Sequence, residues 1–567
     1  MTVAETTGGA VLRRALRRQR ARVAAGIALL CTHQATEALV PVAIGVVIDR
    51  AVATGDVRAL LLSLAGLAAL FTVLAFAYRA GARLAFAAVE HEAHTTRVEI
   101  VRSALDPRGR RSGLRDGELL SVTASDAELS ALVVRVAGLT AAALTAIVVA
   151  AVALLVVDIP LGLGVLIGVP LLVVALQRMA PLLTRRSTSQ QEALAATTAL
   201  AVDLVTGLRV LRGIGAQDHA ARRYAGASRH ALDVTLRAAT TKGLHLGLTT
   251  TVNGLFLATV AGFAGWLALQ GRLTIGELVA VVGLAQFIAE PVQTLGYCVQ
   301  LFAMARASAG RVARVLGAAP VVQPGDAGPP APGPSRLALD GVSYAGLDDV
   351  NLRVGAGEIL GVLAYDPSDA EALVALLAGR VPRAEHRGTL RVDGVPADEL
   401  HIDAARATIL VEQHDVALFE GTLRNNLCAG TSVDDEVLCA AVRAAAEDVL
   451  AAHPHGLDRL LTERGANLSG GQRQRIGLAR ALVADPPVLV LHNPTTAVDS
   501  VTEGLLAARL ATARGTGTRG TVLITTSPAL LRITDRVAVI DRGRVVAEGP
   551  HELLLASDAR YREETLR

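Results

Sequence analysis

The stretch Leu468-Ser469-Gly470-Gly471-Gln472-Arg473-Gln474-Arg475 carries the most specific information in the sequence about its fold. A helix is expected to follow the two glycines. Glycine lets a backbone approach a phosphate closely, and the free N–H groups and the dipole at a helix N-terminus attract an anion. Ser469 adds a hydroxyl donor beside them. The stretch therefore predicts a helix whose N-terminus faces a phosphate.

Short strand-like runs alternate with helical ones on both sides of this stretch. These runs are Leu337–Val342, Ile359–Ala364, Val488–Leu491, Thr521–Thr526 and Arg536–Ile540. Such a rhythm is typical of an α/β domain with a largely parallel sheet. The segment 316–335 is rich in Pro and Gly, which do not fit the interior of a helix or strand. We therefore expect a linker at 316–335 and an α/β domain at 336–567.

Residues 1–315 have a different character, because they contain six apolar stretches of about the length that crosses a bilayer. The stretches are 23–48, 59–78, 131–157, 161–180, 244–270 and 275–304. The chain has 567 residues, of which 52% are apolar and 19% charged, so an ordinary soluble enzyme is disfavoured. A net charge of +3 argues against a nucleic-acid partner. The sequence predicts an α-helical six-span transmembrane domain in a lipid bilayer.

The orientation of this domain follows from its arginines. They cluster before the first stretch and after the fourth, and positive residues stay on the cytoplasmic side. The connections after the first, third and fifth stretches are short, whereas those after the second and fourth are long and helix-like. We expect a multi-pass protein of the inner (plasma) membrane, with the N-terminus, both long loops and the α/β domain in the cytoplasm.

These features together resemble the ATP-binding cassette (ABC) transporter family, and in particular an exporter-type (type IV) half-transporter. The stretch at 468–475 matches the signature motif of that family. Gln413 lies where the family has its Q-loop glutamine, and Asp499 keeps the position of the D-loop aspartate. Glu463 belongs to a segment that resembles the exporter-specific loop, which in the family contacts the coupling helices. The resemblance implies six spans followed by one α/β ATP-binding cassette.

The phosphate loop of the family, GxxGxGK[ST], is altered in this chain. The aligned residues are Ala364, Tyr365, Asp366, Pro367, Ser368, Asp369, Ala370 and Glu371. Ala370 replaces the lysine, Glu371 replaces the Mg²⁺-binding hydroxyl, and the three glycines are absent. We expect the carboxylates of Asp366, Asp369 and Glu371 to face the charge of the triphosphate. Each like-charge pair near 4 Å costs about 4 kcal/mol. Because the only lysine in the chain is Lys242, tight ATP binding here is not expected.

The positions that would hold Mg²⁺ and activate water are also replaced. His492 and Asn493 stand where the family has an Asp-Glu pair, which holds the metal and polarises the attacking water. Ser527 stands at the position of the switch histidine. His492 is an alternative base by its ordinary pKa, but the missing lysine disfavours that role. The chain alone is therefore expected to be catalytically inactive, with no tightly bound ATP.

ABC cassettes pair head to tail, so each ATP lies between the phosphate loop of one chain and the signature of the other. The resemblance implies that ATP and Mg²⁺ bind at a composite site. A second half-transporter would supply an intact phosphate loop, Asp-Glu pair and switch histidine, and this chain would supply Ser469, Gly470, Gly471 and Gln472. The implied function is one subunit of a heterodimeric ATP-driven transporter, with export as the leading direction.

Two alternatives remain open. Some families with exporter-like architecture import metal-chelating siderophores, and the residues do not exclude that direction. A membrane-embedded regulatory subunit that never hydrolyses ATP is the other alternative. Retention of Gln413, Glu463, the signature and Asp499 argues against it, because a purely structural domain has no use for a phosphate-facing glycine pair.

Polar residues inside the spans are the only indication of the cargo, a small molecule or a peptide. The candidates for a cargo cavity are His33, Glu37, Asn253, Gln286 and Glu290. Such residues usually face the interior of a bundle or an aqueous cavity. Glu37 and Glu290 would attract a cationic cargo. Helix packing or contact with water, without any cargo, is the alternative explanation.

Overall fold

The computed structural model describes residues 7–178, 180–429, 433–451, 454–515 and 517–566. Contacts within the chain divide it into two compact units. The first unit comprises the residues up to Arg102 together with Leu114–Gly317. The second comprises Ser103–Gly113 together with Ala318–Arg567.

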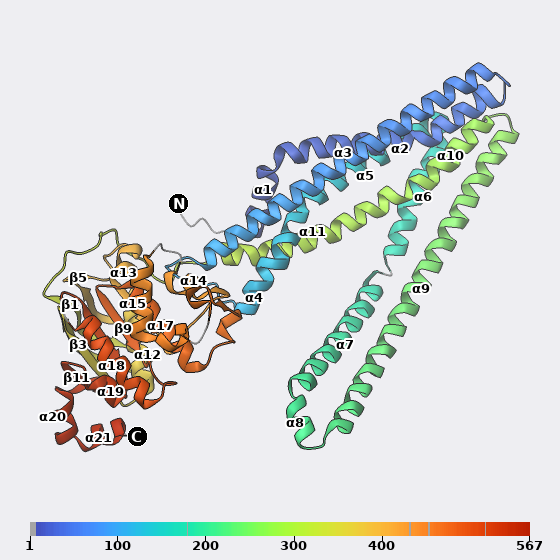
Figure 1. Ribbon diagram of the computed structural model, residues 1–567. Coiled ribbons are helices and arrows are strands. Elements are labelled where there is room, and N and C mark those ends of the chain that lie inside the picture. Colours follow the sequence, from blue (N-terminus) through green and yellow to red (C-terminus); the bar gives the residue numbers. More distant parts are fainter. Residues whose placement is uncertain (1–6, 179, 430–432, 452–453, 516, 567) are drawn as a thin grey trace. The chain divides into compact units, whose positions relative to one another are not determined.

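The first unit is built of helices (Figure 1). They are α1 (Gly8–Arg18), α2 (Arg20–Val47), α3 (Val57–Ala104), α4 (Asp116–Ser121), α5 (Ala127–Val157), α6 (Ile159–Gln177), α7 (Ala180–Thr206), α8 (Leu208–Gly213), α9 (Gln217–Leu269), α10 (Ile275–Phe287) and α11 (Ala289–Leu316). Figure 1 shows α7 and α9 side by side, joined at one end by α8.

Four helical segments of the described chain are long and apolar enough to cross a membrane: Val57–Ala104, Gly117–Val157, Gln217–Leu269 and Ile275–Leu316. Six spans were expected, and the first and fourth of them fall in α2 and α6, which are not among these four. The apolar part of α6 is the shorter segment Ile159–Ala175. The polar residues His33, Gln34 and Glu37 interrupt the run of apolar residues in α2, although the helix itself is continuous.

Small residues and ion pairs hold the helices of this unit together. A Cβ built on Gly45 would lie 2.4 Å from the carbonyl oxygen of Gly276, so α2 and α10 touch backbone to backbone. The buried carboxylate of Asp126 pairs with Arg311 of α11, with 2.6 Å between Oδ2 and Nε. These contacts explain why alanine and glycine are frequent in the apolar stretches, because larger side chains would separate the helices.

The second unit contains both strands and helices. Its strands are β1 (Ser335–Tyr344), β2 (Leu347–Gly355), β3 (Ile359–Ala364), β4 (Arg387–Val392), β5 (Val395–Pro396), β6 (Ile409–Glu412), β7 (Gly421–Thr422), β8 (Leu460–Leu461), β9 (Val488–His492), β10 (Gly520–Ile524), β11 (Arg536–Asp541) and β12 (Arg544–Gly549). Its helices are α12 (Pro367–Leu377), α13 (Ile402–Thr408), α14 (Leu423–Cys428), α15 (Asp435–Ala445), α16 (Glu447–Ala451), α17 (Gly470–Ala484), α18 (Ser500–Arg514), α19 (Pro528–Leu531), α20 (His551–Ser557) and α21 (Ala559–Leu566).

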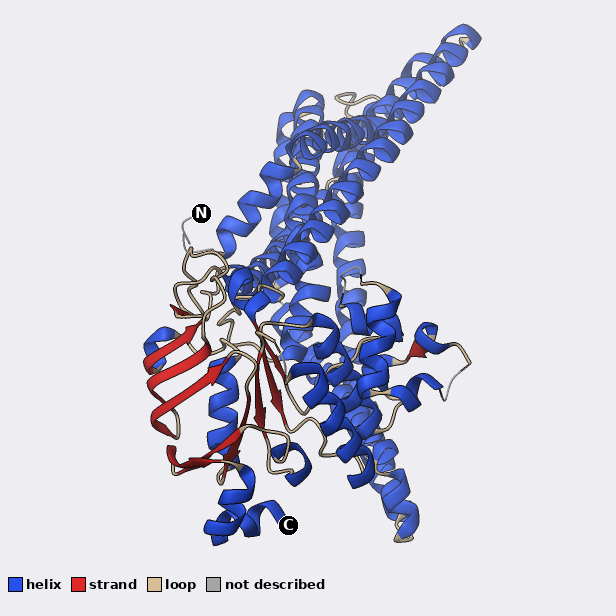
Figure 2. Ribbon diagram, turned by 60° about the vertical axis from the view of Figure 1, so that its left-hand side comes forward, coloured by secondary structure: helices blue, strands red, loops and turns tan. Residues whose placement is uncertain are grey.

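The main sheet of this unit has the strand order β12-β11-β3-β10-β9-β6, and only the β11–β12 pair is antiparallel. Figure 2 shows the strands of this unit in red. A separate antiparallel sheet has the order β2-β1-β4-β5. Residues of β3, β9 and β10 are almost completely buried, as expected for apolar strands in the middle of a sheet. The parallel pairing brings the carboxyl ends of β3, β10 and β9 to one edge.

The segment between α11 and β1 lies along the second unit. Ala327 donates its N–H to Glu399 O at 2.9 Å and accepts the N–H of His401 at 2.7 Å. The segment Ser103–Gly113 also belongs to this unit, although the sequence assigned it to a long loop of the membrane domain. It is held there by Arg110, whose Nη1 donates to Ala318 O at 2.8 Å. The linker is therefore held against the second unit by hydrogen bonds at Ala318 and Ala327.

Candidate functional site

A cavity of about 330 Å³ opens at the edge where β3, β9 and β10 end. It is lined by the segments that follow these strands, because parallel strands place their carboxyl ends side by side. The lining residues are Ala364, Tyr365, Pro367, Ala370, Glu371, His414, His492, Asn493, Thr496, Ile524, Thr525, Thr526 and Glu564. Four of the altered phosphate-loop positions and both altered metal and base positions therefore meet in one place.

The N-terminus of α12 is closed by its own chain. Asp366 is the N-cap residue, and its Oδ1 accepts the N–H of Ser368 at 2.9 Å. The N–H of Asp369 donates to Asp366 O at 3.1 Å, and Pro367 has no N–H. Hydrogen bonds from Ser368 lower the pKa of Asp366, so its carboxylate stays ionised. The helix end that would hold a phosphate already has an anion on it.

The carboxylates of this loop do not act together. Asp369 is 3% exposed, and its Oδ2 accepts the N–H of Gly543 at 2.9 Å, in the turn between β11 and β12. The expectation that Asp369 faces triphosphate is wrong, because its side chain is buried and is hydrogen-bonded to Gly543. Glu371 does line the cavity.

His492 ends β9 as a buried, uncharged base. Its ring lies 5.3 Å from the ring of His414, edge to face, and 3.3 Å separates its Nε2 from Asn493 Nδ2. Burial lowers the pKa of His492, the neighbouring His414 lowers it further, and Glu371 opposes both. Among the described residues, no group of three or more His, Cys, Asp or Glu side chains has the arrangement of a metal site. At the positions of the Asp-Glu pair, His492 and Asn493 offer an imidazole and an amide in place of two carboxylates.

Asn493 and Ser527, at two positions that are catalytic in the family, differ in their relation to the cavity. Asn493 lines it with its backbone at φ +46°, a left-handed conformation that asparagine tolerates. Ser527 caps α19, since its Oγ accepts the N–H of Leu530 at 3.3 Å. The cavity is lined instead by its neighbours Thr525 and Thr526.

The signature helix α17 presents a different kind of N-terminus. Ser469 Oγ accepts the N–H of Gln472 at 3.2 Å, and Gln472 Oε1 accepts the N–H of Ser469 at 3.0 Å. The N–H groups of Gly470 and Gly471 have no acceptor in the part of the chain that the structure describes. A Cβ on Gly471 would lie 2.4 Å from Ala497 O, so this glycine is required by packing as well. The end of α17 is thus free to receive an anion.

Two side chains of α17 that the sequence analysis left unassigned hold the neighbouring loops. Gln474 donates through Nε2 to Thr496 Oγ1 at 2.7 Å and accepts the N–H of Ala497 at 2.9 Å. Arg480 pairs with Glu412 at 2.7 Å and donates to Ala417 O at 2.9 Å. The polar residues Gln474 and Arg480 within an otherwise largely apolar helix are the signal in the sequence for these contacts.

The remaining predicted residues lie around this helix. Gln413 directly follows β6 and is partly buried. Asp499 caps α18 by accepting the N–H of Thr502 at 3.0 Å, and this hydrogen bond lowers its pKa. Glu463 is exposed at the start of a short 3₁₀ turn.

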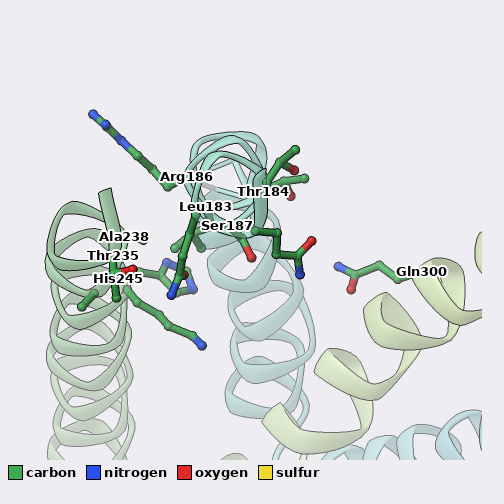
Figure 3. Close-up of a pocket in the computed structure, with 13 residues that line it drawn as sticks. Leu183, Thr184, Arg186, Ser187, Thr235, Ala238, His245 and Gln300 are labelled. Carbon is green, nitrogen blue, oxygen red and sulfur yellow. The ribbon is translucent and has the colours of Figure 1, made fainter. Parts of the chain in front are cut away.

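The predicted cargo residues are brought together only in part. His33 Nε2 lies 3.5 Å from Glu37 Oε2, one helical turn away, and Glu290 is close enough to repel Glu37. Asn253 is half-buried on α9, and Gln286 is exposed on α10. The first unit has a cavity of about 680 Å³, lined mainly by residues of α7 and α9 (Figure 3), and none of the five lines it.

Two family models match this sequence. The ABC transporter transmembrane region matches residues 23–292, and the ABC transporter domain matches residues 347–496. The first covers α2 to the start of α11, and the second covers β2 to the loop after β9.

Several curated proteins are similar over most of this chain. The multidrug efflux ATP-binding/permease protein Rv0194 of Mycobacterium tuberculosis is 32% identical over 72% of the chain, which spans only 34% of that protein. The mycobactin import ATP-binding/permease protein IrtB of Mycolicibacterium smegmatis is 32% identical over 73% of the chain and 72% of its own length. An ATP-dependent lipid A-core flippase of Syntrophus aciditrophicus is 26% identical over 71% of the chain.

Proposed function

The chain belongs to the ABC transporter family, and we propose that it is the catalytically silent subunit of a heterodimeric ATP-driven transporter. In this proposal a second half-transporter binds ATP and Mg²⁺ with its own phosphate loop, Asp-Glu pair and switch histidine. This chain completes that site with Ser469, Gly470, Gly471 and Gln472, and contributes its helices to the pathway through the membrane.

The contrast between two helix ends carries the proposal. The end of α12 is covered by the Asp366 carboxylate, whereas the end of α17 keeps the N–H groups of Gly470 and Gly471 free. A helix N-terminus with free N–H groups is an anion site, and one that holds its own carboxylate is not. The chain therefore keeps what it would offer to a partner's ATP and lacks what it would need for its own.

The direction of transport has two candidates. Export is favoured by the exporter-type arrangement of spans and cassette and by the similarity to an efflux protein. Import is favoured by the similarity to mycobactin import proteins, of which the chain covers 72% and 84%. Flux of cargo in sealed inside-out vesicles, with ATP outside, separates them: export accumulates cargo in the vesicle, and import depletes it.

Co-purification tests the proposal as a whole. The tagged chain is isolated from its native membrane under mild conditions, and the accompanying proteins are identified by mass spectrometry. The proposal expects a stoichiometric second half-transporter whose sequence has GxxGxGK[ST] and an Asp-Glu pair. Recovery of this chain alone, or as a homodimer, would contradict the proposal and favour a regulatory role without ATP hydrolysis.

A further inference from the structure

One face of α1 is a dense cluster of arginines. A hollow of about 550 Å³ on this face is lined by Ala10, Arg13, Arg14, Arg17 and Arg18. The four arginines form two pairs spaced by four residues, so the members of each pair are neighbours on the helix surface. We call these four residues the arginine face of α1.

The opposite face of α1 is covered by the protein itself. Val11, Leu12 and Ala15 are at most 6% exposed and belong to an apolar core shared with α3, α5 and α11. At the start of α1, a Cβ on Gly8 would lie 3.0 Å from the backbone nitrogen of Gly310 in α11. An amphipathic helix at a membrane surface usually buries its apolar face in the lipid. Because the apolar face of α1 is already packed, the face left open to a ligand is the arginine face.

Two carboxylates of α3 neutralise part of this charge. Glu99 pairs with Arg14, with 2.8 Å between Oε2 and Nη2, and also with Arg18. The Oε1 of Glu92 lies 3.5 Å from Nη1 of Arg18. These ion pairs hold two of the four guanidinium groups in place against α3.

The other two arginines keep their charge uncompensated. The side chains of Arg13 and Arg17 are exposed, and neither has an ion-pair partner in the described parts of the chain. The neighbouring sequence supplies no carboxylate either, because residues 7–36 contain six arginines and no aspartate or glutamate. The arginine face therefore has a net positive charge and is suited to an anionic ligand.

The position of α1 in the chain indicates which anion it meets. The helix ends at Arg18, and the first predicted span begins near residue 23. The arginine face thus lies beside the membrane surface, in the cytoplasm by the predicted orientation. Anionic phospholipids give that surface a negative potential, which attracts basic segments next to a span.

We propose that the arginine face of α1 binds the anionic headgroups of phospholipids in the cytoplasmic leaflet. Arg13 and Arg17 supply the charge that meets the lipid, and Arg14 and Arg18 fasten the helix to α3 through Glu99. The contact is electrostatic, because the apolar side chains of α1 are packed inside the protein. This binding does not depend on the proposed heterodimer or on ATP hydrolysis.

Lipid photocrosslinking measures the contact directly. The complex, as it purifies, is placed in phosphatidylcholine nanodiscs that contain a trace of phosphatidylglycerol with a diazirine next to its glycerol backbone. A second sample contains phosphatidylcholine with the same diazirine. After illumination, crosslinks in peptides that contain α1 are counted by mass spectrometry. Phosphatidylglycerol should label α1 about tenfold more than phosphatidylcholine does, and about 1 M salt should reduce this excess.

A matched pair of double variants tests the charge. Arg13→Gln with Arg17→Gln should reduce the excess of phosphatidylglycerol labelling to about twofold or less. Arg222→Gln with Arg223→Gln removes two exposed arginines of α9, about 30 Å along the helix from the predicted fifth span, and should keep the full excess. Equal labelling by the two lipids, or a full excess in the first double variant, would overturn the proposal and leave these arginines as determinants of membrane orientation alone.

A soluble anion tests whether the membrane is the source of the headgroup. Glycerol 3-phosphate carries the phosphate of phosphatidylglycerol without its acyl chains. At a concentration of about 1 mM it should leave the labelling of α1 by phosphatidylglycerol unchanged, because it is not held beside the helix by the bilayer. Abolition of the labelling by glycerol 3-phosphate would identify a site for a free phosphate and would overturn the proposal.

Discussion

The Oδ1 of Asp366 accepts the backbone N–H of Ser368 at 2.9 Å and so closes the N-terminus of α12 from within the chain. Pro367 at the first helical position removes one further donor from the same turn. A nucleotide phosphate at this position would have to displace a carboxylate that hydrogen bonds keep ionised. In the proposed function, this helix cap is therefore a second reason, besides the missing lysine, why the loop does not bind ATP.

Two aspartates of this loop should differ sharply in their effect on stability. Asp369→Ala leaves the buried N–H of Gly543 without its acceptor, which should lower the free energy of unfolding of the second unit by about 2 kcal/mol. Asp366→Ala, at an exposed cap, should have the smaller effect. The measurement is denaturant unfolding of the full chain, followed by the reactivity of Cys428 and Cys439, which pack against the core of this unit. Equal losses in the two variants would contradict the inward position of Asp369.

The Arg480–Glu412 pair should be strongly coupled. Burial raises the pKa of Glu412, and Arg480 opposes that rise, so Arg480→Met leaves a buried carboxylate without a partner. We expect a loss of about 3 kcal/mol for this variant. The double variant with Glu412→Gln should lose less than the sum of the single losses, by about 1 kcal/mol or more. Arg473→Met on the same helix is the control, and additivity of the two single losses would count against the pair.

The buried His492 should make the second unit sensitive to acid. Its pKa is lowered from 6.5, so below about pH 6.5 the unfolded chain binds a proton that the folded chain does not. The contribution of His492 to the free energy of unfolding is thus complete above this pH and decreases as the pH is lowered. Hydrogen exchange of the β9 peptide, corrected for the intrinsic effect of pH, should speed up between pH 7.5 and 5.5. His492→Gln should weaken this pH dependence, whereas His401→Gln, at an exposed histidine, should not. An unchanged pH dependence in His492→Gln would show that His492 is not the group responsible for it.

The two signature glycines should separate folding from function. Gly471→Ala places a Cβ 2.4 Å from Ala497 O and should destabilise the fold, whereas the nearest contact for Gly470→Ala is an ordinary 3.4 Å. Gly470→Asp in the complex should lower ATPase activity about 1,000-fold, because a carboxylate near a phosphate costs about 4 kcal/mol. Ala370→Gly should leave the activity unchanged. Full activity in Gly470→Asp would mean that α17 faces no nucleotide.

The sequence was sufficient for the fold class, because strand-like runs of apolar residues are local signals. It did not reveal that Asp366-Pro367-Ser368 is a helix start, although an N-cap aspartate followed by proline is a known signal for one.

Other features depended on contacts between distant residues. His414 meets His492 only because β6 pairs in parallel with β9. Asp369 turns inward only because the β11–β12 turn presents the N–H of Gly543 to it. The cavity of about 680 Å³ in the first unit needs α7 and α9 to return side by side. None of these contacts can be predicted from the residues next to it in the sequence.

The number of nucleotides bound by the purified complex tests the central claim most directly. The complex is incubated with the non-hydrolysable analogue of ATP that has an imido group between its β- and γ-phosphates, and the bound nucleotide is counted against protein. The account predicts one nucleotide per heterodimer, held by the partner's phosphate loop and the Gly470 end of α17. Two nucleotides per heterodimer would show that the loop closed by Asp366 still binds ATP, and would contradict it.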